Sequence, residues 1–257
     1  MIIDTNVYLS RYPFRRLEGD EPAHLLAKLR QWNVEQAWAG SFDGLLHRDI
    51  AGVNIRLAEA CRDHGQGVLV PFGEINPKLP DWQEDVRRCH EVHQMPGIRL
   101  HPNYHGYSLD DPAFTELVSL AAARGLIVQL AGRMEDERTQ HPLLHVPPVD
   151  LAPLADAVKR VPGLRLELLN CGLHISEEQL KTILNAGEVY MEIATVEGVG
   201  GVGRLVDQLP LSRTLFGSYY PFFDFESALF KMRESGLDGK SLKAIDEDNA
   251  RRLRRRA

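Results

Sequence analysis

A histidine at the end of a predicted strand is the first candidate for chemistry. His101 closes the apolar run "GIRLH" (97–101), two residues after Arg99. An imidazole changes charge near neutral pH, so His101 suits a general acid or base, while Arg99 suits the binding of an anion. A buried structural histidine is the alternative. Other histidines follow in later loops, of which we expect His105 and His145 to be exposed: His105, His141, His145 and His174.

A second candidate is the charged stretch "RMEDERTQHP" (133–142). It brings Asp136, Arg138 and His141 into one loop, where a carboxylate–histidine pair could transfer protons while the arginine holds an anionic substrate. The whole connection, residues 132–149, is long and follows a predicted strand. We therefore expect a mobile loop that covers the site, with a solvated surface loop as the alternative.

The elements that must position these residues alternate regularly. Short apolar runs typical of buried parallel strands are separated by amphipathic stretches of helical period. The runs are 1–9, 35–41, 67–75, 97–101, 126–131, 164–170, 189–194 and 214–218. Eight strand–helix pairs in 257 residues predict a single-domain α/β fold, a (β/α)8 TIM barrel over residues 1–257, with a doubly wound open sheet as the alternative. In such a barrel the active site lies at the carboxyl ends of the strands.

Five fragments in order then show a resemblance to a known family. They are "IIDTNVYL", "GIRLHPNYHGYSLDDPAFTELVSLAAARGLIVQL", "LAPLADAVKRVPGLRLELLNCG", "LFGSYYPF" and "AIDEDNARRLRR". Together they resemble the amidohydrolase superfamily, in the amidohydrolase-related branch of decarboxylases and lactonases. The resemblance implies a barrel whose strand ends hold one or two divalent metals that activate water. Its ligands would be Asp-x-His-x-His on strand one, a histidine on strands five and six, and an aspartate on strand eight.

This sequence departs from that pattern at almost every ligand. Asp4 remains, and as a carboxylate it is also a catalytic candidate. The other places hold Asn6, Tyr8, Gln129, Asn170 and Tyr219. Amides and protonated phenols are poor ligands for zinc, so we expect no metal and no other cofactor. The same groups are hydrogen-bond donors that suit a substrate carbonyl or a developing oxyanion. The alternative is that they only hydrogen-bond one another in a closed barrel top.

Two further charged residues complete the predicted site. Arg15, in "YLSRYPFRRL", follows strand one and fits a small organic anion. Glu192, in "VYMEIA", is expected to point into the barrel near the substrate, where an arginine or amide must pair with it.

Composition limits the partners. The net charge of −6 gives no reason to expect nucleic-acid binding, and neither a signal peptide nor a long apolar stretch indicates a membrane. Three widely spaced cysteines fit reduced thiols in a cytoplasmic protein. A homo-oligomer is compatible with the sequence.

These observations favour a metal-independent hydrolase, of lactonase type or related C–O, C–N or C–C cleavage, acting on a small carbonyl or carboxylate compound. Two alternatives stay open. One is a non-catalytic pseudoenzyme that binds a ligand or a protein. The other is a metalloenzyme with a displaced site built from Asp4, His101, Asp136, His141 or His174.

Overall fold

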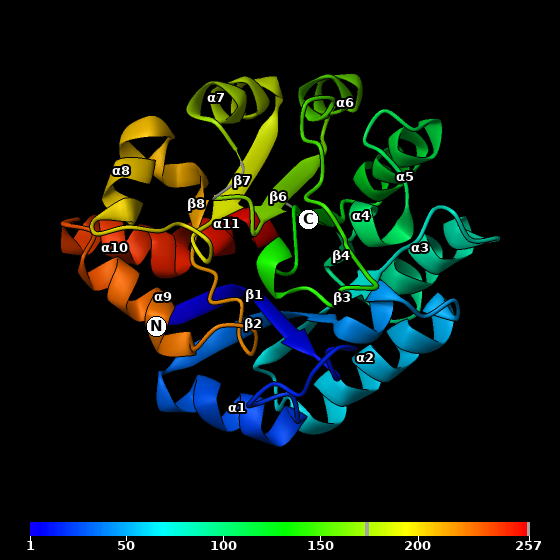
Figure 1. Cartoon of the computed structure of the whole chain (residues 1–257), viewed down its shortest axis with the longest axis horizontal. Helices are drawn as coiled ribbons and strands as arrows, with labels where there is room; N and C mark the ends of the chain where they lie inside the picture. Colours follow the sequence, from blue (N-terminus) through cyan, green and yellow to red (C-terminus); the bar gives the residue numbers. More distant parts are fainter. Residues whose placement is uncertain (173–174, 256–257) are drawn as a thin grey trace.

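In the computed structural model, which describes residues 1–172 and 175–255, eight parallel strands form a barrel (Figure 1). Neighbouring strands pair in chain order from β1 to β8. The strands are β1 (Ile2–Leu9), β2 (Val34–Ser41), β3 (Leu69–Glu74), β4 (Gly97–Leu100), β5 (Ile127–Ala131), β6 (Arg165–Leu169), β7 (Glu188–Glu192) and β8 (Thr214–Leu215). The predicted TIM barrel is confirmed, and each strand ends within a few residues of its expected end.

The barrel closes between β1 and the segment that follows β8. The Thr5 N–H donates to the Phe216 carbonyl over 2.9 Å, and the Tyr219 N–H donates to the Asn6 carbonyl over 2.8 Å. A parallel bridge between Val7 and Tyr220 continues this contact. Residues 216–220 therefore complete the wall that the short β8 begins, and they carry Tyr219 to the mouth of the barrel.

Helices surround the strands as an outer ring (Figure 1). They are α1 (Pro22–Gln31), α2 (Ile50–His64), α3 (Trp82–Glu91), α4 (Pro102–His105), α5 (Pro112–Ala123), α6 (Leu154–Arg160), α7 (Glu177–Ala186), α8 (Gly201–Gln208), α9 (Phe225–Arg233), α10 (Gly239–Lys243) and α11 (Asn249–Arg255). Short helical turns lie at η1 (Phe42–Leu45), η2 (Glu137–Thr139), η3 (Leu211–Arg213) and η4 (Ala244–Asp248). Within the described chain, no helix combines the length and the apolar character needed to cross a membrane.

Local sequence explains where several helices begin. Asp111 accepts a hydrogen bond from the Ala113 N–H, and Pro112 occupies the first turn of α5, as the Asp-Pro pair predicts. Ser176 caps α7 in the same way through the Gln179 N–H. These caps satisfy backbone donors that have no partner within the helix.

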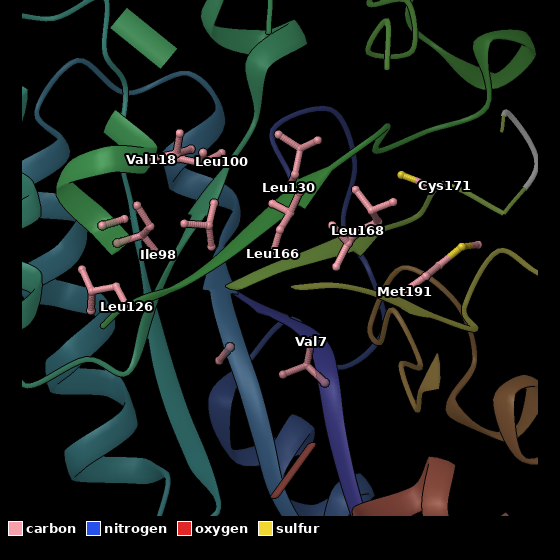
Figure 2. Close-up of a cluster of buried hydrophobic side chains, with 14 of the residues drawn as sticks. Val7, Ile98, Leu100, Val118, Leu126, Leu130, Leu166, Leu168, Cys171 and Met191 are labelled. Atoms are coloured by element: carbon pink, nitrogen blue, oxygen red, sulfur yellow. The ribbon is translucent and has the colours of Figure 1, made fainter. Parts of the chain in front are cut away.

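The largest apolar core lies between the strands and the helices (Figure 2). Ile98 and Leu100 of β4 and Leu166 and Leu168 of β6 alternate with inward-facing neighbours, as the period of two in a strand requires. They pack with helix residues such as Val118 of α5. This alternation leaves the other face of each strand to fill the barrel.

The barrel interior has an apolar layer at the amino ends of the strands and an aromatic layer at the carboxyl ends. The first contains Ile3, Trp38, Phe72, Ile127, Tyr190 and Leu215. The second contains Tyr8, Tyr12, Phe42, Leu45, Ala131, Met134, Leu169, Ala194 and Tyr219. Between them, inward-facing positions carry fully buried polar side chains, among them Glu74, Arg99, Gln129, Glu167 and Glu192. The potential chemistry of the barrel is concentrated in this polar level and in the aromatic layer above it.

Candidate functional site

Arg99 is the centre of the buried polar level. Its guanidinium donates to Gln129 Oε1 over 2.9 Å and to the carbonyls of Val7, Trp38 and Thr5 over 2.8, 3.0 and 3.3 Å. It also lies 4.4 Å from the centre of the Tyr8 ring. Gly40 makes this position available, because a Cβ there would lie 2.6 Å from Arg99 Cδ. Arg99 therefore holds four chain segments together inside the barrel, below the mouth where substrate binding was expected.

Gln129 also lies below the mouth. Its amide donates to the Thr5 carbonyl and to Glu167 Oε2, both over 2.8 Å. Two residues further along β5, Ala131 is the residue that reaches the aromatic layer. We expected Gln129 to lie with the other amides at the mouth, and this prediction is wrong. Side chains alternate along a strand, so Gln129 lies one layer deeper than Ala131.

Asp4 is fully buried and held by hydrogen bonds. Its Oδ1 accepts from the backbone N–H groups of Asn6 and Ser218, each over 3.0 Å, and its Oδ2 accepts from the Ser218 hydroxyl over 2.5 Å. Burial nevertheless raises the pKa of Asp4 to about 7, against the opposing effect of these donors. The carboxyl ties β1 to the segment after β8 and has no free oxygen that points into the mouth.

Asn6, Asn170 and Glu192 form a hydrogen-bonded group above Asp4. The Asn6 amide donates to Asn170 Oδ1 over 2.9 Å, and Glu192 Oε1 accepts the Asn170 backbone N–H over 2.7 Å. Burial raises the pKa of Glu192. Of the two partners expected for Glu192, an arginine or an amide, the structure shows the amide: Asn6 Nδ2 donates to Glu192 Oε1 over 3.4 Å. Backbone N–H groups of Asn170 and Ala194 also donate to this carboxyl.

The loop 132–149, which we call the mouth loop, takes up the remaining donors of this group. The Asn170 amide donates to the Arg133 carbonyl over 3.1 Å, and the Tyr219 hydroxyl donates to the Met134 carbonyl over 2.5 Å. The Met134 side chain is buried in the aromatic layer, with its sulfur 3.6 Å from the Tyr8 hydroxyl. Two backbone carbonyls thus occupy positions that substrate oxygens would need in order to use these donors.

Glu135 fastens the mouth loop to the loop after β1. It is buried, and it accepts hydrogen bonds from Arg15 and, over 2.9 Å, from the Tyr12 hydroxyl. Arg15 also lies 4.9 Å from the centre of the Phe222 ring. Arg15, an expected substrate ligand, is therefore engaged with Glu135 while the loop is closed.

A cavity of about 260 Å³ opens beside these residues, on the β5–β8 side of the mouth. Arg15 and Arg133 contribute positive charge to its lining, Asp136 and Glu197 contribute negative charge, and the aromatic faces come from Tyr219, Phe222 and Phe223. Arg133 is half-buried and makes no ion pair within 4.0 Å in the part of the chain that the structure describes. Asp136 is nevertheless near enough for Arg133 to help lower its pKa. A cation that is not locked in an ion pair, next to flat aromatic rings, suits a small planar anion.

His101 lies across the mouth from this cavity and is fully buried. Its Nδ1 is 3.0 Å from Glu74 Oε2, and its Nε2 is 2.9 Å from the Tyr8 hydroxyl. The Tyr8 ring in turn stacks on Phe42, with ring centres 4.7 Å apart. The structure therefore gives His101 the carboxylate partner that acid–base chemistry needs, from β3 rather than from the mouth loop.

The loop histidines do not form the expected carboxylate–histidine pair. Asp136 binds Arg138, which lowers the pKa of that carboxyl, and Asp136 also caps η2. His141 is exposed, and its Nδ1 accepts the Leu143 N–H over 3.2 Å. Arg138 is 89% exposed at its side chain and does not line the cavity. Only Asp136 of these three lines the cavity.

The remaining histidines differ in exposure. His105, which we expected to be exposed, is buried, and its Nε2 lies 2.8 Å from the Gly44 carbonyl. The reason is that α4 turns its imidazole back under the mouth, and burial lowers its pKa to about 4. His145 is exposed, as expected, near Glu137. His174 lies outside the described residues.

Comparison with known proteins identifies the family of this chain. The sequence profile of the amidohydrolase family matches residues 11–256. This chain belongs to the amidohydrolase family. The matched segment includes the cavity residues and the β3–β4 side of the mouth, and it starts just after the strand that carries Asp4, Asn6 and Tyr8.

Solved structures related to this amidohydrolase share its fold at low sequence identity. A 2,6-dihydroxybenzoate decarboxylase complexed with 2,6-dihydroxybenzoate superposes with a TM-score of 0.76 at 14% identity, covering 99% of each chain. A 5-carboxyvanillate decarboxylase from Novosphingobium aromaticivorans was solved with manganese and 4-hydroxy-3-methoxy-5-nitrobenzoic acid. It superposes with a TM-score of 0.78 at 13% identity, covering 99% of this chain and 96% of the other. The Metarhizium anisopliae IDCase superposes with a TM-score of 0.75 at 16% identity, covering 99% of this chain and 97% of the other. No curated protein matches by sequence.

The residues at the family's metal positions do not fit a divalent ion. Asn6 and Asn170 bond to each other, and the hydroxyls of Tyr8 and Tyr219 are buried phenols whose pKa values are raised. Both oxygens of Asp4 accept hydrogen bonds already. Neutral amides and protonated phenols hold such ions poorly. Across residues 1–172 and 175–255, no three His, Cys, Asp or Glu side chains converge as a metal site, so the displaced set of Asp4, His101, Asp136 and His141 is not assembled.

Tyr219→Phe is expected to loosen the mouth loop. The substitution keeps the ring, which stacks on Phe222 at 4.9 Å, and deletes only the hydroxyl that binds the Met134 carbonyl. Leaving a buried acceptor unsatisfied costs about 1–3 kcal/mol. We expect a lower melting temperature and faster amide exchange in residues 133–140. Tyr190→Phe removes a hydroxyl at the opposite end of the barrel and should leave exchange in this loop unchanged.

Sequence patterns alone missed several residues of this site. Glu74 stands inside the apolar run of β3, two residues after the inward-facing Phe72, and that spacing is the signal that could have revealed it. Glu135 was passed over because it belongs to a charged stretch that reads as solvated surface. Nothing in the sequence marks Met134 as the residue that fills the barrel mouth.

Proposed function

We propose that this amidohydrolase binds a small planar carboxylate in the mouth cavity and acts on it without a resident divalent metal. The observation that carries the proposal is the half-buried Arg133, which makes no ion pair within 4.0 Å in the described chain, beside the rings of Tyr219, Phe222 and Phe223. Such a lining offers charge to a carboxylate and flat faces to an aromatic or otherwise planar body. The names of the related solved proteins, decarboxylases of hydroxylated or methoxylated benzoates, support the same substrate class.

The reaction that fits the residues is cleavage of a bond next to a carbonyl or carboxylate group, by hydrolysis or by loss of the carboxyl group. The donors on Asn170 and Tyr219 would bind the oxygen that gains negative charge, in place of a metal. Those donors become available only when the carbonyls of Arg133 and Met134 move away. The mouth loop would therefore open for substrate and close over it.

A non-catalytic ligand-binding role is the second candidate, and one observation favours it. His101 and Tyr8 are both fully buried beneath Met134, so the closed structure keeps them out of contact with a ligand in the cavity. Turnover of a carboxylate substrate would exclude this candidate.

The cytoplasmic location and a homo-oligomer remain predictions. The three cysteines are free and buried, which is compatible with a reducing compartment.

Calorimetric titration with 4-hydroxybenzoate tests the binding site. Arg133→Ala is expected to weaken binding about 10- to 100-fold, because a hydrogen bond to a charged group contributes roughly 1.5–3 kcal/mol. Arg160→Ala, at the exposed end of α6, is the matched control and should bind as the wild type does. Prior treatment with a chelator should leave the wild-type affinity unchanged. Equal affinities for the Arg133 variant and the wild type, or loss of binding after chelation, would contradict the proposal.

A further inference from the structure

Three buried polar groups from different strands form a continuous chain under the barrel mouth. Glu74 at the end of β3, His101 just after β4 and Tyr8 near the end of β1 are each fully buried. Glu74 Oε2 lies 3.0 Å from His101 Nδ1, and His101 Nε2 lies 2.9 Å from Tyr8 Oη. Carboxylate, imidazole and hydroxyl are thus aligned in the order that a proton transfer through the imidazole requires.

The carboxylate end of this chain is held in place by its surroundings. Glu74 Oε1 accepts the Ser41 N–H over 3.1 Å, which leaves Oε2 for the imidazole. Gly44 provides the space, since a Cβ there would lie 2.3 Å from Glu74 Cγ. Neither Oε2 nor the imidazole Nδ1 makes a hydrogen bond to another group in the described chain, and the two atoms face each other as a close charge pair at 3.0 Å. Glu74 is therefore placed to orient the His101 ring and to stabilise it when it is charged.

The hydroxyl end of the chain faces the cavity, with one side chain between them. The Met134 sulfur is 3.6 Å from the Tyr8 hydroxyl on one side, and Met134 lines the cavity on the other. A thioether is flexible and a weak hydrogen-bond acceptor, so a ligand oxygen can replace it at little cost. Rotation of this one side chain would connect the cavity to Tyr8.

We propose that Glu74, His101 and Tyr8 form a proton relay that serves the mouth cavity once the Met134 side chain moves aside. The relay rests on the proposed function, because it acts on a ligand bound in that cavity. A hydroxyl of the ligand or of a water molecule gives its proton to Tyr8 Oη, while Tyr8 gives its own proton to His101 Nε2. The Tyr8 phenol ends uncharged, the positive charge resides on the imidazolium beside Glu74, and the ligand or hydroxide carries the negative charge.

The neighbours of the relay are consistent with this distribution of charge. Burial raises the pKa of Tyr8, and Glu74 adds to this effect while the guanidinium of Arg99 opposes it. The phenol therefore stays protonated at neutral pH and conducts a proton without ionising. Beside the imidazole, the His105 ring lies with its centre 6.1 Å away, and its low pKa keeps it uncharged. Glu192, whose charge also raises the pKa of Tyr8, and Tyr219, with its ring centre 5.8 Å from that of Tyr8, are further titratable groups near Tyr8.

A coloured ligand allows the relay to be measured without knowing the substrate. The probe is 4-hydroxy-3-nitrobenzoate, whose carboxylate can bind Arg133 and whose hydroxyl changes absorbance when it ionises. In the wild type, the bound probe is expected to ionise at lower pH than in solution. Calorimetry in buffers of different ionisation enthalpy should show that the protein retains the proton. Nitrogen NMR of labelled histidine should show both His101 ring nitrogens protonated in the complex.

Two variants separate the relay from a purely structural network. Tyr8→Phe and Glu74→Gln should still bind the probe, but its ionisation should shift back toward its free-solution pH and its proton should pass to the buffer. Tyr190→Phe is the control and should behave as the wild type does. A wild-type complex that releases its proton to the buffer, or a Tyr8→Phe variant that retains it, would overturn the relay. Absence of probe binding to the wild type would instead refute the proposed function.

Met134→Ala tests whether the Met134 side chain separates the cavity from Tyr8. Removal of the thioether should let the probe associate faster and keep the same ionisation shift, because the relay itself is unchanged. Probe association at the wild-type rate would show that Met134 does not limit access to Tyr8. That measurement can be made on the wild-type and variant proteins even where the Glu74 and Tyr8 variants do not fold.

Discussion

Replacing Arg99 with leucine is expected to lower the free energy of unfolding by about 3–5 kcal/mol, which is enough to unfold many domains. The guanidinium is fully buried and donates to one side chain and three backbone carbonyls. Leucine fills part of the space but leaves these four acceptors unsatisfied inside the barrel, and each such group is costly. It also removes the cation that faces the carboxyl of Glu167.

Urea unfolding of the wild type and the variant measures this effect. Arg160→Leu, on the exposed end of α6, should change the free energy of unfolding by less than about 0.5 kcal/mol. Arg99→Lys should be intermediate, since it keeps the charge and loses the planar set of donors. An Arg99→Leu variant as stable as the wild type would show that these contacts do not hold the strands together. In that case substrate binding would again become the more plausible role of Arg99.

Raising the pH from about 6.5 to 8.5 is expected to destabilise the protein by about 2–3 kcal/mol. Burial raises the pKa of Asp4 to about 7 and that of Glu167 to about 8, against ordinary values of 3.8 and 4.5. In this range the folded protein binds more protons than the unfolded chain, which is already ionised. Stability that is fully present near pH 4 is therefore lost as the pH rises through 7 and 8.

Other groups add to this effect or oppose it. Burial also raises the pKa of Glu192, which acts in the same direction. Below about pH 6.5, the buried His105 acts in the opposite direction, because its pKa of about 4 keeps it neutral in the folded state while the unfolded chain becomes protonated. Above about pH 8.5, ionisation of unfolded thiols adds to the loss, because burial raises the pKa of each cysteine in the folded protein.

Glu167→Gln is the variant that tests the origin of the pH dependence. The amide resembles a protonated carboxyl, so the variant should lose most of the slope between pH 7 and 8.5 and should exceed the wild type in stability at pH 8.5. Glu84→Gln, at an exposed carboxyl whose arginine partners lower its pKa to about 2, should keep the wild-type slope. A wild-type stability that is constant or rises across this range would show that the interior carboxyls are ionised throughout.

The sequence by itself determined the architecture. The barrel follows from local signals, which are apolar runs of strand length, helical periods between them and caps such as Asp111 with Pro112, and each is visible within a few neighbouring residues. The sequence also showed amides and phenols at the places where the family resemblance implies metal ligands, namely Asn6, Tyr8, Gln129, Asn170 and Tyr219. The types of the residues at the mouth could therefore be predicted.

Only the tertiary structure decided which of these groups meet. Whether His101 pairs with Glu74 or with a carboxylate of the mouth loop depends on the stagger of β3 against β4, and no local pattern encodes that stagger. The depth of a side chain within the barrel is likewise decided only by the tertiary structure. The inward-facing alternation on β5 puts Gln129 and Ala131 in different layers, and only the closed barrel shows which layer reaches the mouth. Met134 and Glu135 lie in a charged loop that reads as surface, yet they are buried because the aromatic side chains of three other segments enclose them. Contacts between residues distant in sequence are set by the packing of the whole barrel, so the partners of each polar group could be found only in the structure.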